Sequence, residues 1–360
     1  MTMQAADVRA YDHQALVAFS VETLAAAGLP EAQARIAAAG LAYADLHGFD
    51  SHGAINLARI YLPKVHDGAI ARDGVPGVVR AQGATVRIAG RRAIGFVSAA
   101  FAMDQACRLA RAHGIGCAAV DGLTHSGSMG FYVKTAVDDG LIGLALINLG
   151  SQALVPAPGS TTPLVGTNVV AAGVPAGDLP PFLLDMSTAA VSTGRVRLAA
   201  RRDEPIPAGW LADAEGRDVT DPRALDAGTA FLLPLGGQAS GYKGLGLALL
   251  CDLLCAALSG AAAGPVGATA SDENIGLVLI AIDPKALRSM DAFREAVDQI
   301  LSAVLAVDTT DPDTPVVYPG YREAMTARHR QTHGIPLDGA TVASLVEAGE
   351  RVGVAFPAAR

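Results

Sequence analysis

The sequence predicts an α+β fold in which helices from both chain ends flank a middle segment that contains the strands. Three observations support this prediction. Apolar residues recur with helical spacing over residues 15–66 and 290–352. Short runs rich in Val and Ile, bounded by Gly and Pro, occur between these regions. No Gly-x-Gly-x-x-Gly follows a strand-like run, so the sequence does not support the common Rossmann fold.

The N-terminal helices are predicted at 15–27, 31–46 and 53–66. The first two end at glycines, which favour helix C-termini. Asp50 and Ser51 favour helix N-caps and predict the start of the third helix. The C-terminal helices are predicted at 290–306, 321–332 and 339–352.

The middle of the chain alternates strands and helices. Strands are predicted at 78–79, 85–88, 115–120, 141–147, 169–174, 182–185 and 275–282. Helices are predicted at 98–113, 131–138, 188–202 and from the glycine-rich loop 236–244 to about 258. The loop 148–168 is long, and such loops in compact proteins are usually functional or disordered. We therefore expect a discontinuous helical domain, 1–75 with 285–360, and a mixed α/β domain, 76–284.

Composition excludes several classes of protein. The chain has 360 residues, 51% hydrophobic and 17% charged, which predicts a buried core. A net charge of −8 argues against nucleic-acid binding. The four cysteines lack zinc-ligand spacing and are expected to be buried free thiols. The apolar segment 244–264 carries Asp252 and is expected to be a buried helix, not a membrane span. Few cysteines and no secretory leader predict a cytoplasmic protein.

The motif Asp50-Ser51-His52-Gly53 stands where the third helix is predicted to begin. The N–H groups and the dipole at a helix start attract anions. A hydroxyl and an imidazole there could hold a carboxylate and a carbonyl group. The alternative is a capping serine beside a surface histidine.

The motif Thr124-His125-Ser126-Gly127 lies between a predicted buried strand and a helix, where catalytic groups often occur. A histidine can donate a proton to a carbonyl that is being reduced. The alternative is an ordinary strand-to-helix turn. Ser128 does not fit a hydrolase nucleophile motif, because Ser126 stands where that motif needs glycine.

The motif Gly241-Tyr242-Lys243-Gly244 lies at the start of an apolar helix. A lysine among glycines there can bind phosphate through its charge and through backbone N–H groups. The alternative is a solvated lysine in a glycine-rich turn. The spacing is not that of a P-loop.

Together and in this order, these motifs resemble the malate/L-lactate dehydrogenase family of the non-Rossmann type. Its members include ureidoglycolate and sulfolactate dehydrogenases, diketogulonate reductase and Δ1-piperideine-2-carboxylate reductase. Further matching segments are Gly166-Thr167-Asn168, Leu184-Asp185-Met186-Ser187-Thr188, Ile206-Pro207-Ala208-Gly209-Trp210, Asp221-Pro222, Leu233-Pro234-Leu235-Gly236-Gly237 and Tyr318-Pro319-Gly320. The resemblance covers nearly the whole chain.

The resemblance implies a homodimer with a helical domain and a largely antiparallel, non-Rossmann NAD(P)-binding domain. It makes His125 the expected proton donor and acceptor, with Ser51 and His52 beside the substrate. The expected cofactor contacts are Asn148, Gly150, Thr167, Asn168, Asp185, Met186, Ser187 and Lys243. The expected substrate contacts are Asn56, Arg59, Tyr61 and Glu273. No metal is required, because protonation by His125 can neutralise the developing oxyanion.

Two positions depart from the family pattern. Asn56 and Glu273 stand where relatives often have arginines, and one residue is inserted before Tyr61, close to Arg59. Because an arginine can grip a carboxylate with two hydrogen bonds, these replacements reduce the positive charge expected in the pocket. A dicarboxylate substrate such as malate is therefore disfavoured.

The sequence thus predicts an NAD(P)H-dependent oxidoreductase that interconverts a small 2-oxo acid and its 2-hydroxy acid by hydride transfer, with a small carboxylate as substrate. The alternative is an NADPH-dependent reductase of a cyclic imine carboxylate of the Δ1-piperideine-2-carboxylate or Δ1-pyrroline-2-carboxylate type. The intact His125 and Lys243 disfavour a non-catalytic relative. Leu149-Gly150-Ser151 carries no acidic residue, which favours NADPH over NADH as the cofactor.

Overall fold

The computed structural model describes residues 8–269, 271–311 and 313–360, and its centre is a seven-stranded sheet. The order is β2-β3-β4-β13-β5-β8-β9. These strands are β2 (Gly77–Gln82), β3 (Thr85–Ala89), β4 (Ile115–Leu123), β13 (Ile275–Ile282), β5 (Ile142–Ile147), β8 (Val169–Val174) and β9 (Phe182–Ser187). Neighbouring strands are antiparallel except β3 and β4. The sheet is therefore largely antiparallel, as predicted.

Helices cover both faces of this sheet. They are α4 (Gly95–His113), α5 (Gly130–Asp138), α8 (Gly237–Asp252) and the π-helical turn η2 (Leu253–Ala257) that continues α8. Alternate residues of a strand face opposite sides. Leu277 and Leu279 join the core that includes α4, whereas Val278 packs with Cys255 of η2. Gly276 allows this approach, because a Cβ there would lie 2.5 Å from the Cys255 carbonyl oxygen.

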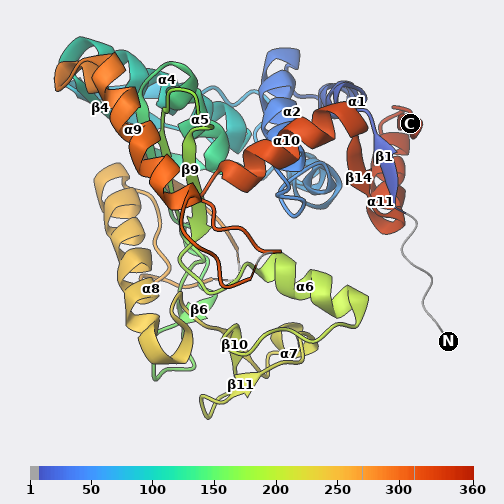
Figure 1. Ribbon diagram of the computed structural model, residues 1–360. Helices are drawn as coiled ribbons and strands as arrows, with labels where there is room; N and C mark the ends of the chain where they lie inside the picture. The colour runs from blue at the N-terminus through green and yellow to red at the C-terminus, as the bar shows by residue number, and fades with distance from the viewer. Residues whose placement is uncertain (1–7, 270, 312) are drawn as a thin grey trace.

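The two chain ends pack together on one side of the molecule (Figure 1). Strand β1 (Arg9–Tyr11) pairs antiparallel with β14 (Ile335–Leu337). The surrounding helices are α1 (His13–Ala26), α2 (Glu31–Leu46), α10 (Tyr321–His333) and α11 (Gly339–Glu350). One hydrophobic core runs from these helices into the sheet. Helix α9 (Met290–Leu305) lies apart from them, and its Asp298 accepts the N–H groups of Gly177 and Asp178.

A smaller unit with its own core was not predicted from the sequence. It contains β6 (Val155–Pro156), β7 (Pro163–Val165), α6 (Thr193–Arg202), β10 (Leu211–Ala212), β11 (Asp218–Val219), α7 (Arg223–Asp226) and β12 (Phe231–Leu232). The prediction of a helix over 188–202 is wrong at its start. Thr188 donates its N–H and hydroxyl to the Asn168 carbonyl, and Ser192 caps the helix by accepting the Arg195 N–H.

The segment Gly237–Ala257, formed by α8 and η2, is the one helix among the described residues that is long and apolar enough to cross a membrane by length and composition. The prediction that it is buried holds for one face only, which includes Cys251 and Asp252. The apolar side chains of the other face are exposed, and they include Tyr242, Leu250, Leu253 and Leu258. The four cysteines are free, as expected. Three of them are buried, but Cys117 is only half-buried, so the prediction of burial is wrong for this residue.

Candidate active site

Ser51 and His52 lie in a turn that follows α2. The predicted helix over 53–66 begins later than expected, at Ile55, so neither Asp50 nor Ser51 caps it. The segment contains η1, a π-helical turn (Leu57–Tyr61), and α3 (Leu62–His66). Ser51 Oγ lies 2.9 Å from His52 Nδ1. The serine therefore orients the neighbouring imidazole and not a helix terminus.

Two side chains from outside the turn hold it in place. Asp45 of α2 accepts the Ala54 N–H at 2.8 Å, and a Cβ at Gly53 would lie only 1.6 Å from Asp45 Oδ1. Arg330 of α10 donates from Nη1 to the Asp45 carbonyl and to Asp50 Oδ1, both at 2.5 Å. Burial raises the pKa of the Asp45 carboxyl group to about 7. The turn is thus clamped between α2 and α10.

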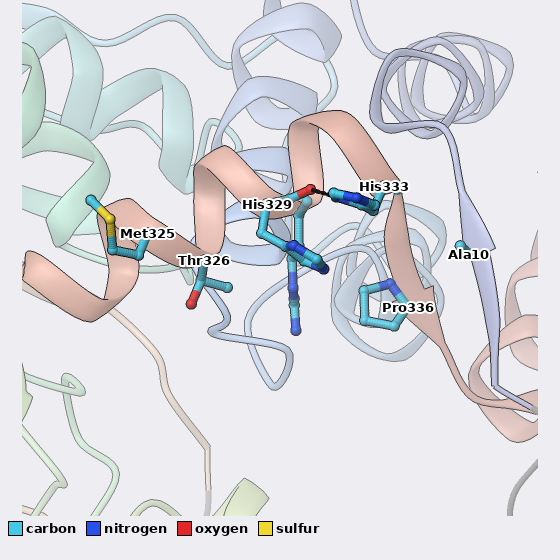
Figure 2. Close-up of a pocket in the computed structure, with 8 residues that line it drawn as sticks. Ala10, Met325, Thr326, His329, His333 and Pro336 are labelled. Atoms are coloured by element: carbon cyan, nitrogen blue, oxygen red, sulfur yellow. Dashed lines mark hydrogen bonds between the residues drawn. The ribbon is translucent and has the colours of Figure 1, made fainter. Parts of the chain in front are cut away.

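Arg330 also lines a pocket on α10, which Figure 2 shows. The rings of His329 and His333 stack beside it, with 4.1 Å between their centroids. The complete lining is Ala10, Met325, Thr326, His329, Arg330, His333, Gly334 and Pro336. None of the predicted site residues belongs to this lining.

His125 lies in the loop between β4 and α5, as predicted. Its Nδ1 is 2.6 Å from the Tyr61 hydroxyl, and the Gly127 N–H points at the same nitrogen at 3.4 Å. The His52 ring is nearly parallel to it, with 6.3 Å between centroids and 22° between planes. Burial, followed by the charge of His52, lowers the pKa of His125 to about 4, and burial also lowers the pKa of His52. Both rings are therefore neutral at pH 7.

The π-helical turn η1 explains how Tyr61 reaches His125. A π-turn holds about one residue more than an α-turn, which fits the insertion expected before Tyr61. Tyr61 is completely buried and packs on Phe96, with 5.1 Å between ring centroids. The structure thus places Tyr61, predicted as a substrate contact, as the hydrogen-bond partner of His125.

Asp185 joins the His125 loop to the sheet. From β9 it accepts the Ser128 hydroxyl at 2.6 Å and the Gly130 N–H at 2.7 Å. Gly130 begins α5, so the carboxylate also satisfies a free N–H at that helix start. The negative charge of Asp185 raises the pKa of His52, but burial of the ring lowers that pKa by more.

An ion pair that the sequence did not predict lies near His125. Lys64 of α3 pairs with Asp272, and their side chains are 25% and 20% exposed. Asp272 raises the pKa of His125 and Lys64 lowers it. Glu273, the predicted substrate contact, is exposed and forms no ion pair in the described part of the chain. The helical spacing of Tyr61 and Lys64 was a usable signal, whereas nothing in the sequence distinguished Asp272 from Glu273.

A family model described as malate/L-lactate dehydrogenase matches residues 11–346. The chain belongs to the malate/L-lactate dehydrogenase family. It is 35% identical to the L-sulfolactate dehydrogenase of Methanothermobacter thermautotrophicus over 321 residues, 88% of this chain and 89% of that one. It also resembles the malate dehydrogenase of Entamoeba histolytica, with 25% identity and a TM-score of 0.92 over 98% of this chain and 100% of that one. It is also similar to the Δ1-piperideine-2-carboxylate reductase of Pseudomonas syringae pv. tomato. The sequence identity is 27% and the TM-score is 0.80, over 94% of this chain and 99% of that one. As a member of this family, the chain is an NAD(P)-dependent dehydrogenase.

In this dehydrogenase, several predicted cofactor contacts meet at one end of β8 and β9. Ser187 Oγ donates to the Thr167 carbonyl at 2.8 Å. The segment that carries Lys243 lies beside them, because a Cβ at the neighbouring Gly244 would be 2.8 Å from the Thr188 carbonyl oxygen. The structure therefore brings Thr167, Ser187 and the start of α8 together.

Asn148 is committed to the interior. Its Nδ2 donates to Asp252 Oδ1 at 2.9 Å and to the Ala262 carbonyl at 2.8 Å. Its Oδ1 accepts the N–H groups of Gly150 and Gly276 at 3.1 and 2.8 Å. These four bonds use both donors and the acceptor of the amide. Asn148 would therefore hold the backbone around a cofactor site in place, and its amide would not contact the cofactor.

The other predicted cofactor contacts are Asn168, Met186 and Gly150. Asn168 is buried and donates to the Ala248 carbonyl at 2.9 Å. Met186 is half-buried on β9. Gly150 has a φ of +60°, and a Cβ there would lie 1.9 Å from the Glu273 carbonyl oxygen, so this position requires glycine.

The predicted substrate contacts before Tyr61 have different surroundings. Asn56 is buried, and its amide donates to the Ser51 carbonyl at 2.9 Å, so it supports the Ser51 turn. Arg59 is exposed and has no acidic partner within the described residues. Partial burial, then the charges of Arg201 and Arg197, lower the pKa of Arg59. Arg59 thus lies near the basic residues of α6.

The site fits a nicotinamide nucleotide. The Ser126 hydroxyl is buried without a hydrogen-bond partner, and the Lys243 ammonium is exposed and free of any acidic partner among residues that the structure describes. Such groups can bind the polar parts and phosphates of a dinucleotide. The described residues contain no group of three or more potential His, Cys, Asp or Glu metal ligands.

Proposed function

We propose that this dehydrogenase interconverts a small 2-oxo acid and its 2-hydroxy acid, with His125 as the acid and base. The observation that carries the proposal is the fixed, face-to-face placement of His125 and His52 in a partly buried site. NADPH or NADH, when bound, supplies the hydride. His125 gives a proton to the substrate oxygen during reduction and takes it back during oxidation.

The low pKa of His125 has a chemical consequence. In the free enzyme the ring is neutral at pH 7, so it is ready to accept a proton from a hydroxy acid. For reduction it must first be protonated. A substrate carboxylate beside it favours the charged ring and raises its pKa. We propose that Ser51 and His52 hold this carboxylate, so that substrate binding prepares His125 for proton donation.

The substrate is proposed to carry one carboxylate. The Asn56 amide already donates to the Ser51 carbonyl, and Glu273, the other predicted substrate contact, is negatively charged. A second buried substrate anion would therefore lack a partner, which is costly. Arg59 is the one candidate for such a partner on η1, and it is exposed.

A second candidate is reduction of a cyclic imine carboxylate, favoured by the likeness to the piperideine-carboxylate reductase. A protonated iminium needs less proton donation than a ketone. Replacing His125 should therefore affect imine reduction less than oxo-acid reduction.

The test is a substrate panel run with NADH and NADPH on wild type and His125→Ala. We expect pyruvate or a longer monocarboxylic oxo acid to be reduced more efficiently than oxaloacetate. His125→Ala should lower oxo-acid turnover by about two to four orders of magnitude and leave cofactor affinity within twofold. Near-normal oxo-acid turnover in the variant would overturn the assignment of His125, and imine reduction without oxo-acid reduction would favour the second candidate.

We also propose that the enzyme uses NADPH, with contacts from Thr167, Met186, Ser187 and Lys243, and that it is a cytoplasmic homodimer without a required metal. The exposed apolar face of α8 and η2 supports the dimer. An apolar helix face of this kind is typical of a contact surface. Titration with both nucleotides and a mass measurement in solution test these points.

A further inference from the structure

We propose that Lys64 determines substrate specificity: its ammonium group supplies the positive charge that binds the substrate carboxylate, beside the hydrogen bonds proposed for Ser51 and His52. Asp272 is the positioning residue that holds Lys64 for this contact. The inference rests on the proposed function, because it concerns the carboxylate of the proposed 2-oxo acid. Lys64 stands at neither of the two positions where relatives often have arginines.

The carboxylate of a 2-oxo acid needs a cationic partner in a partly buried site, because an unpaired buried charge is costly. The residues predicted to contact the substrate do not supply one beside His125. The Asn56 amide donates to the Ser51 carbonyl, and Glu273 is an acid. Arg59 is exposed and lies near the basic residues of α6.

Strands β4 and β13 bring Asp272 to the same edge of the sheet as His125. The two strands pair antiparallel, and Ile275 at the start of β13 lies opposite Leu123 at the end of β4. His125 follows Leu123 by two residues, and Asp272 precedes Ile275 by three. Because paired strands leave a sheet side by side, the segments that carry Asp272 and His125 emerge next to each other.

The segment that carries Asp272 also contacts a loop predicted to bind the cofactor. The Ser151 N–H donates to the Glu273 carbonyl at 3.3 Å, and Gly150 approaches the same carbonyl closely. Asp272 thus lies beside both this loop and the His125 loop. A substrate that exchanges a hydride with the cofactor and a proton with His125 binds near this point.

One helical segment contacts both His125 and Asp272. The Tyr61 hydroxyl lies 2.6 Å from His125 Nδ1. Lys64 follows Tyr61 by three residues, a spacing that places two side chains on the same face of a helix, and it pairs with Asp272. Besides burial and the charge of His52, Asp272 raises the pKa of His125 and Lys64 lowers it, as expected for charges close to the ring.

The ammonium group of Lys64 can serve Asp272 and a substrate carboxylate together. It has three N–H donors, and the described residues give it one acceptor, Asp272 Oδ1. Both side chains of the pair are partly exposed, so the other donors are accessible. The pair is neutral in the free enzyme. With a bound carboxylate the three groups carry one net negative charge, which favours the protonated His125 that reduction requires.

Lys64→Met tests the inference, and Lys134→Met is the matched control. Lys134 of α5 also pairs with an aspartate, Asp138, with 2.7 Å between Nζ and Oδ2, and it is not among the predicted site residues. Each protein is assayed with pyruvate and with the uncharged pyruvamide at saturating nucleotide. The readout is the ratio of kcat/KM for pyruvate to kcat/KM for pyruvamide.

Lys64→Met should lower this ratio about ten- to a hundredfold, the effect of one lost charge-assisted hydrogen bond. Lys64→Arg keeps the charge and should keep most of the ratio, and Lys134→Met should leave the ratio within twofold of wild type. Asp272→Asn keeps an acceptor for Lys64 but removes the competing negative charge, so its ratio should equal or exceed that of wild type. The nucleotide Kd should stay within twofold in all four variants.

The ratio isolates the charge of the carboxylate, because a structural defect or a changed proton affinity of His125 acts on both substrates and cancels. A ratio within twofold of wild type in Lys64→Met would overturn the inference. An equal fall in Lys134→Met, or a fall in Asp272→Asn, would also overturn it. A failure of the proposed function is distinguishable, because it would appear as normal oxo-acid turnover in His125→Ala whatever the ratios show.

Discussion

Asp45→Asn should change the pH dependence of stability in a defined direction. Burial raises the pKa of Asp45 from 3.8 to about 7. A raised pKa means that the folded state holds the proton more tightly, so its contribution is full below pH 3.8 and is lost as pH rises through 7. About three pH units separate the two values. At about 1.4 kcal/mol per unit, wild type should lose about 4 kcal/mol over this range relative to the variant, as an upper limit.

Asparagine resembles the protonated carboxyl group and can still accept the Ala54 N–H. The assay is denaturant unfolding of both proteins at pH 4, 5, 6, 7 and 8. The variant should gain stability relative to wild type as pH rises, with most of the gain complete by pH 8. A difference that stays flat, or that falls with pH, would refute the claim that Asp45 is a protonated, buried clamp of the Ser51 turn. His125, with a lowered pKa, has the opposite slope, but it is common to both proteins and cancels.

Three further predictions follow from the site and its surface. Lys243→Ala should weaken nucleotide binding by about 1.5–3 kcal/mol, the value of a charge-assisted contact, with a smaller effect on kcat. Calorimetric titration measures the affinity, and unchanged affinities for both nucleotides would contradict the prediction. Because the pKa of free His125 is about 4, kcat/KM for hydroxy-acid oxidation should show no fall from His125 protonation above about pH 5.5, whereas a group titrating near 6.5 that disappears in His125→Ala would contradict it. Leu250→Glu with Leu253→Glu should give a folded monomer by light scattering, and an intact dimer would exclude this face as the contact.

The sequence predicts the regular elements well where one physical signal dominates. The helix at 31–46 and the strands at 169–174 and 275–282 have the predicted bounds. Helical periodicity and the glycine stop at Gly48 explain the agreement for the helix, and continuous apolar runs explain it for the two strands. The two-residue strands β10 and β12 escape detection, because so short a segment carries no period and depends on pairing with distant residues.

In the candidate site, too, the sequence predicts some features and not others. Motifs identify Ser51, His52 and His125, which the structure brings together. They do not reveal what holds them, because Asp45 and Arg330 act through contacts across the fold. The cap predicted at Ser51 fails for this reason: a carboxyl group from another helix takes the N–H that a local cap would serve.

The contact between Tyr61 and His125 could not be predicted without the backbone conformation of residues 57–61. An inserted residue is visible in the sequence, but its effect depends on whether the helix shifts its register or forms a π-turn. The structure forms a π-turn at Leu57–Tyr61, and the Tyr61 hydroxyl lies against His125 Nδ1. Likewise, a count of arginines and acids could not show that Asp272 and not Glu273 pairs with Lys64.

The most direct test of the central claim is isotope transfer from the nucleotide to the substrate. NADPH with deuterium at both C4 positions is incubated with a monocarboxylic 2-oxo acid, and the product is examined by mass spectrometry and NMR. The account predicts one deuterium at C2 of the 2-hydroxy acid with wild type, and product formation slowed by about two to four orders of magnitude with His125→Ala. A hydroxy acid without deuterium at C2, or equal rates for the two proteins, would contradict it.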